Sequence, residues 1–162
     1  FIIIIYIYIY YIIEPFLLTS SLLFGKELLV QSVSKTTTNI YKGLEDINSD
    51  ESFHFTKILE ELDIKAKLDI IHEFINELND NNIIKSKFNK SKSTDKILSY
   101  LCDILKNIET EIESINIEIK THKTKWFNKF RTATYITIIE NLKKHLTILD
   151  SRFDLLLKLL NY

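Results

Sequence analysis

Two long heptad series in the C-terminal half constrain the fold of this chain more than any other feature. Each series steps by three and four residues without a miss, the first over residues 98–126 and the second over residues 135–160. The members of the first are Leu98, Leu101, Leu105, Ile108, Ile112, Ile115, Ile119, His122 and Trp126. The members of the second are Tyr135, Ile139, Leu142, Leu146, Leu149, Phe153, Leu156 and Leu160. Because residues at this spacing line one face of an α-helix, each series predicts a long amphipathic helix.

A short connection separates the two series, and it determines how the two helices pair. Thr94 is the expected N-cap of the first helix, and Thr132 or Thr134 that of the second. Helices joined in this way pack in opposite directions, so the sequence predicts an antiparallel hairpin over about 94–126 and 133–160. Further apolar residues flank the two seams: Ile97, Ile104, Ile117, Ile138, Ile148 and Leu157. A stripe of this width predicts that additional helices pack against the hairpin.

The segments that precede the hairpin supply candidates for these additional helices. Residues 52–62 and 64–78 carry apolar residues at helical spacing. Ser49 or Ser52 is the expected N-cap of the first of these helices, and Asp63 that of the second. The sequence therefore predicts a bundle of four to six helices built on the hairpin.

Composition supports an all-α fold. The chain of 162 residues has two Gly and one Pro, which leaves too few positions for the tight turns of β-sheets and for phosphate-binding loops. Lys and Arg number 21 and Asp and Glu 22, so we expect no overall attraction to nucleic acid. The abundant Ile, Lys, Asn, Phe and Tyr residues have codons of A and T alone, a usage typical of AT-rich genomes such as those of protists and large DNA viruses.

The first half of the chain is predicted to contain two further parts. Residues 25–48 are expected to form a stalk or two short helices, with a break at the polar sequence SVSKTTTN (residues 32–39). Residues 1–24 form a hydrophobic segment that contains one charged residue, Glu14. The predicted helical bundle domain then comprises residues 49–162.

Three interpretations of the segment Phe1 to Phe24 remain open. As a membrane anchor it reaches the required length of about 20 residues only if Glu14 and Pro15 lie within the span. As a non-native extension it is AT-rich sequence in front of a gene, read as protein. As part of the fold it is a buried strand or helix. The single cysteine, Cys102, permits no intramolecular disulfide, so we expect a cytoplasmic protein, or a membrane-anchored one facing a reducing compartment.

Residues that support catalysis or metal binding are not found together in the sequence. Cys102 falls on the apolar face of the first hairpin helix, where a thiol is an inert small hydrophobic group. Glu118 and His122 are four residues apart and share a helical face, but a metal site needs a further ligand, and none is identified. We therefore expect no catalytic residue, no metal, no cofactor and no small-molecule substrate.

The connection between the hairpin helices has the most distinctive chemistry in the chain. The segment 122–135, HKTKWFNKFRTATY, combines four basic residues with three large aromatic residues and contains no acid. The candidate contact residues are Lys123, Lys125, Trp126, Phe127, Lys129, Phe130 and Arg131. Such a pattern suits anionic lipid headgroups, or single-stranded nucleic acid whose bases stack on the rings. In the structural alternative the aromatic residues close the end of the bundle and the cations complement a helix C-terminus.

These observations predict a non-catalytic structural or interaction protein that acts through coiled-coil-like helix surfaces, either free or attached to a membrane. Its expected partner is another protein or a second copy of itself. The alternative is a membrane-binding or nucleic-acid-binding protein that uses the segment 122–135, with nucleic acid the less expected of the two.

Overall fold

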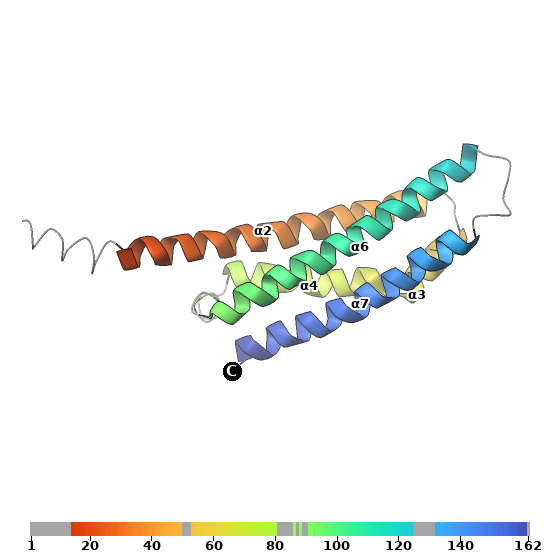
Figure 1. Cartoon of the computed structure of the whole chain (residues 1–162). Helices are drawn as coiled ribbons and strands as arrows, with labels where there is room; N and C mark the ends of the chain where they lie inside the picture. Colours follow the sequence, from red (N-terminus) through yellow and green to blue (C-terminus); the bar gives the residue numbers. More distant parts are fainter. Residues whose placement is uncertain are drawn as a thin grey trace, which may run out of the picture.

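The computed structural model describes residues 14–49, 53–80, 86, 88, 91–124 and 132–161. Within these ranges the chain forms five α-helices and no strand, which confirms the predicted all-α fold. The helices are α2 (Glu14–Ser49), α3 (Phe53–Glu61), α4 (Ile64–Asp80), α6 (Lys92–Thr124) and α7 (Thr132–Asn161). Figure 1 shows α2, α6, α7 and the consecutive pair α3 and α4 running along one common direction as an elongated bundle.

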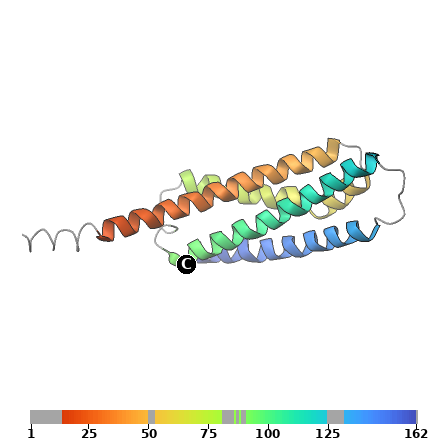
Figure 2. The ribbon, with the colours of Figure 1, turned by 45° about the horizontal axis from the view of Figure 1, so that its top comes forward.

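Helices α2 and α6 lie side by side and run in the same direction (Figures 1 and 2). Their contacts keep an almost constant offset along the two helices. The Sγ atom of Cys102 lies 3.5 Å from the carbonyl oxygen of Leu29, and further along, Asn116 Nδ2 donates to the carbonyl of Gly43 at 2.9 Å. This parallel pair forms one wall of the bundle.

Helices α6 and α7 form the antiparallel hairpin that the two heptad series predict. Arg152 donates to the carbonyl of Tyr100, and Asn141 Nδ2 donates to Glu111 Oε1 at 3.2 Å, so contact positions rise on one helix as they fall on the other. The predicted ranges, 94–126 and 133–160, agree with Lys92–Thr124 and Thr132–Asn161 to within two residues at each end. This part of the prediction is confirmed.

The described members of the two heptad series form about half of the core. Leu98, Leu105 and Ile108 have no exposed surface, and in the second series only Tyr135 is more than 9% exposed. Ile117 is an exception among the flanking residues, because 63% of its surface is exposed. It stands two residues from the nearest seam positions, about 200° around the helix, and so points to solvent. The prediction that Ile117 widens the buried stripe is wrong.

The predicted break at residues 32–39 is also wrong, because α2 continues through this sequence to Ser49. Val33, Ile40 and Ile47 recur every seven residues and have no exposed surface, so one face of α2 is buried along the bundle. Thr36 and Thr37 are buried as well. Threonine is only mildly unfavourable in a helix, and tertiary packing against α6 outweighs that preference.

Lys26 occupies the same row of α2 as these buried residues, one heptad before Val33, and is 3% exposed. Its ammonium nitrogen lies 2.6 Å from the carbonyl oxygen of Phe88, 2.9 Å from that of Ser91 and 3.1 Å from Asp95 Oδ1. A buried charge is tolerated only when it is paired and hydrogen-bonded in this way. Lys26 therefore fastens α2 to the start of α6.

Two of the predicted helix caps can be compared with the structure. Helix α6 begins at Lys92, so the prediction that Thr94 is its N-cap is wrong; Thr94 Oγ1 instead lies 2.6 Å from the carbonyl oxygen of Ser91. Asp63 directly precedes α4, as predicted. Its φ of 52° is left-handed, a conformation that Asp adopts more readily than most residues, and it lets the chain turn sharply between α3 and α4.

None of the helices in the described ranges combines the length and the apolar character needed to cross a membrane. Glu14 and Pro15 occupy the first turn of α2, where proline is well tolerated because its missing N–H has no helical partner. Residues 1–13, which contain most of the predicted anchor, lie outside the described residues.

Candidate functional site

The sequence placed its candidate contact residues in the segment 122–135. The side chains of residues 122–134 lie outside the described residues. The predicted contacts of Lys123, Lys125, Trp126, Phe127, Lys129, Phe130 and Arg131 with lipid or nucleic acid therefore stay predictions.

Of the residues considered for catalysis and metal binding, the structure describes the side chains of Cys102 and Glu118, which are 16 residues apart on α6. Cys102 is 4% exposed and lies between α2 and α6, where burial raises the pKa of its thiol. Within the ranges that the structure describes, no group of three or more His, Cys, Asp or Glu residues could hold a metal ion. The side chain of His122, the proposed neighbour of Glu118, is outside those ranges.

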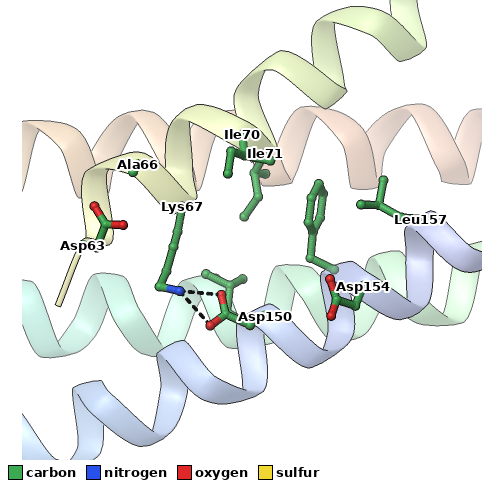
Figure 3. Close-up of a pocket in the computed structure, with 10 residues that line it drawn as sticks. Asp63, Ala66, Lys67, Ile70, Ile71, Asp150, Asp154 and Leu157 are labelled. Atoms are coloured by element: carbon green, nitrogen blue, oxygen red, sulfur yellow. Dashed lines mark hydrogen bonds and ion pairs between the residues drawn. The ribbon is translucent and has the colours of Figure 1, made fainter.

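The structure instead reveals a surface groove between α4 and α7, with a volume of about 380 Å³ (Figure 3). It is lined by Asp63, Ala66, Lys67, Ile70, Ile71, Leu149, Asp150, Phe153, Asp154 and Leu157. We call this surface the α4–α7 groove. Its floor is apolar, because Ile71 and Leu149 belong to the bundle core.

The groove exists because α4 and α7 meet at separate points and not along their whole length. At one point Lys67 Nζ lies 2.8 and 2.7 Å from the two carboxylate oxygens of Asp150. At another, the rings of Phe74 and Phe153 pack edge to face, with centroids 5.5 Å apart. The main apolar row of α4, which includes Leu68 and Ile75, is buried in the core. The adjacent face of α4, which carries Ile70, therefore lies beside α7 and is only partly covered by it.

The wall of the groove exposes one large apolar side chain, that of Ile70. Ile70 is 55% exposed and stands beside Ile71, with Leu157 on the opposite helix (Figure 3). A single exposed isoleucine is ordinary. An exposed isoleucine over an apolar floor is a feature of interaction sites, because burying it against a partner is favourable.

The rim of the groove is acidic. The residues that line the groove include three carboxylates and one cation, so their net charge is −2 at neutral pH. The carboxylates belong to Asp63, Asp150 and Asp154, and the cation is Lys67. Lys67 and Asp150 retain side-chain exposures of 28% and 50%. Their ion pair is accessible to water and salt, so it contributes little to stability. It can therefore be rearranged at small cost.

Sequence reasoning missed this groove. Ile70 lies just beside the buried row of its helix, and its exposure depends on the distance to α7, which no local pattern records. Lys67 and Asp150 are 83 residues apart in the chain. The available signal was an apolar residue adjacent to the seam residue Ile71, and this pattern is common in buried helices.

The fold and the groove define this chain as an all-α bundle protein with an acid-rimmed surface groove over an apolar floor. It is similar to uncharacterized protein L717 of Acanthamoeba polyphaga mimivirus, with 27% identity over 81% of this chain and 74% of the viral protein. The similarity agrees with the composition typical of AT-rich genomes. No family model matches the chain, and no solved structure matches it.

Proposed function

We propose that this protein is a non-catalytic helical interaction protein, and that the α4–α7 groove binds a partner polypeptide. The observation that carries the proposal is the exposed Ile70 above an apolar floor of core residues. Apolar surface of this kind, surrounded by charged residues, resembles the centre and rim of a protein interface.

The groove also indicates the chemistry of its partner. A volume of about 380 Å³ suits one or two large apolar side chains, which are the usual anchors of an interface. The carboxylates of Asp63 and Asp154 favour basic residues at either side of those anchors. The best-matched partner is therefore a polypeptide segment that combines aromatic and basic residues.

Two observations support the non-catalytic part of the proposal. The buried thiol of Cys102 has a raised pKa, so little nucleophilic thiolate forms at neutral pH. The groove carboxylate of Asp150 is half exposed and already paired with Lys67, whereas catalytic carboxylates are commonly desolvated. Metal analysis of the purified full chain gives a further test, because stoichiometric zinc or iron would favour an enzyme.

A site-specific photo-crosslinker tests the groove directly. It is placed at position 70 of the full chain, and at position 117 in a control, because Ile117 is exposed to a similar extent on α6. We expect a discrete cross-linked polypeptide from position 70 and none from position 117, in lysate of the source organism or with the purified protein alone. Equal adducts from both positions, or none from either, would contradict the proposal.

Attachment to a membrane through residues 1–24 is a separate proposal, supported by the uncharged run of residues 1–13. Liposome flotation at low and high salt compares the full chain with a chain that starts at Glu14. The shortened chain keeps Lys26, whose ion pair with Asp95 joins α2 to the start of α6. Flotation that survives high salt and needs residues 1–13 supports the anchor. Flotation of neither chain rejects it.

A further inference from the structure

One segment of this chain has the chemistry that the α4–α7 groove favours. Residues 123–131 carry Lys123, Lys125, Lys129 and Arg131 without an acid, together with Trp126, Phe127 and Phe130. The groove offers an apolar floor and a net charge of −2. We infer that the groove of one molecule binds residues 123–131 of a second copy of this chain. The inference rests on the proposed function of the groove and names its partner.

The groove cannot bind the same segment of its own chain. Phe153 lies 21 residues after the start of α7 at Thr132, which is about 32 Å along the helix at 1.5 Å per residue. Trp126 follows the end of α6 at Thr124 by two residues, and can lie at most about 7 Å from it. Helix α6 ends at the same end of the bundle where α7 begins (Figure 1). Leu149, the α7 residue of the groove nearest to that end, lies about 25 Å along the helix from Thr132, so a gap of more than about 15 Å separates Trp126 from the groove. Only another molecule can supply the contact.

Each molecule then has one groove and one segment, at different places along the bundle. Two copies can exchange segments reciprocally and close a dimer, or each copy can bind the next and extend a chain. Both arrangements bury Ile70. Charge attraction between the segment and Asp63 or Asp154 contributes to binding and is screened by salt, so the association should weaken as salt rises.

The chain contains one tryptophan, Trp126, so its fluorescence reports the proposed contact without a label. We expect the emission of the purified full chain to shift to shorter wavelength as protein concentration increases, while light scattering shows a mass above the 19.2 kDa of the monomer. In 1 M salt both changes should appear only at a protein concentration that is higher by about tenfold or more. A mass of one chain at every concentration would overturn the inference.

Substitutions then separate the two halves of the contact. Ile70→Glu should weaken association about tenfold or more, because it places a charge in the apolar site. Ile117→Glu is the matched control and should have no effect. On the segment, Trp126→Ala should act like Ile70→Glu. Lys129→Glu is a second segment variant that keeps the aromatic residues. Circular dichroism and urea unfolding establish that each variant is folded.

Mixing the variants gives the sharpest result. The Ile70→Glu chain keeps an intact segment, and the Trp126→Ala chain keeps an intact groove, so the mixture should form a dimer at a concentration where each variant alone is monomeric. Association that persists in Ile70→Glu would overturn the inference.

The remaining outcomes distinguish this inference from the proposed function. If the crosslinker at Ile70 captures a different polypeptide, the groove is an interaction site and self-association is wrong. If the chain stays monomeric, and Lys129→Glu abolishes its binding to anionic vesicles or to a single-stranded oligonucleotide, the segment contacts that polyanion and the inference fails.

Discussion

The two glycines of the chain lie on one helix, α2, and the structure predicts opposite effects for their replacement by alanine. At Gly43, α2 comes close to α6: a Cβ atom there would lie 2.6 Å from Cγ2 of Ile112, a contact shorter than proteins show. Ile112 is 1% exposed and belongs to the bundle core. At Gly25 no atom lies within 4 Å of the added Cβ. The pair therefore separates helix propensity from packing.

The magnitudes decide the sign at each position. Alanine is about 1 kcal/mol better than glycine inside a helix, and this gain applies to both substitutions. At Gly43 the gain opposes overpacking, which costs about 1–3 kcal/mol. Ile112 is β-branched and keeps one rotamer in a helix, so the helices must separate and strain the hydrogen bond from Asn116, worth about 1 kcal/mol. We expect Gly43→Ala to destabilise the protein by about 1–2 kcal/mol and Gly25→Ala to stabilise it by about 0.5–1 kcal/mol.

Equilibrium unfolding in urea, followed by circular dichroism, measures both changes. Ile112→Leu moves the branch away from the backbone and removes the clashing methyl, so the double variant with Gly43→Ala should recover part of the lost stability relative to the two single variants. A Gly43→Ala protein as stable as the parent would refute the close approach of α2 and α6. An unstable Gly25→Ala protein would refute the assigned helix.

Three further predictions concern single positions. Lys26→Met should lower the unfolding free energy by about 2–4 kcal/mol in urea titration, because it removes the ammonium group that donates to the carbonyls of Phe88 and Ser91 and pairs with the carboxylate of Asp95. At Asp63, whose φ is 52°, valine should cost about 1–2 kcal/mol and glycine should not lower the melting temperature, because only glycine adopts that φ freely. Cys102 should react with iodoacetamide much more slowly in the folded protein than in urea. Burial raises the pKa of the folded Cys102 thiol above its unfolded value near 9.0. The contribution of the thiol to stability is therefore complete below pH 9 and is lost as pH rises through the folded pKa. Urea unfolding of the parent protein and of Cys102→Ala at each pH would measure this loss.

The accuracy of the sequence-based predictions follows the range of the interactions involved. The hairpin was predicted to within two residues at each end because the described members of each heptad series lie within one helix. The sequence wrongly predicted a break in α2 because the pattern of apolar residues in this helix is sparse. Its fully buried row has one apolar residue per heptad, at Val33, Ile40 and Ile47, with polar residues between them. Buried Thr36 and Thr37 look like loop residues in the sequence, and only the neighbouring α6 makes them helical.

The α4–α7 groove could not be predicted because it depends on a gap between two helices that are far apart in the sequence. Nothing near Ile70 in the sequence shows that α7 stays far enough away to leave it exposed. The acidic rim combines Asp63 before α4 with Asp154 in the C-terminal half of α7, so its charge exists only in the folded chain. The segment 123–131 was recognisable from sequence alone because its basic and aromatic residues are consecutive.

The polar contacts of the bundle favour α4 and α7 as the pair that the proposed partner contacts. Between α2 and α6, buried Lys26 fixes one end, and the hydrogen bond from Asn116 to Gly43 fixes the other. Sliding α2 by one heptad would preserve its apolar row but leave the Lys26 ammonium buried without its acceptors, at a cost of several kcal/mol. Between α4 and α7 the polar contact is the exposed ion pair of Lys67 with Asp150, which is worth at most about 1 kcal/mol. A partner can therefore displace that ion pair and cover the groove without disturbing the contacts that set the register of the bundle.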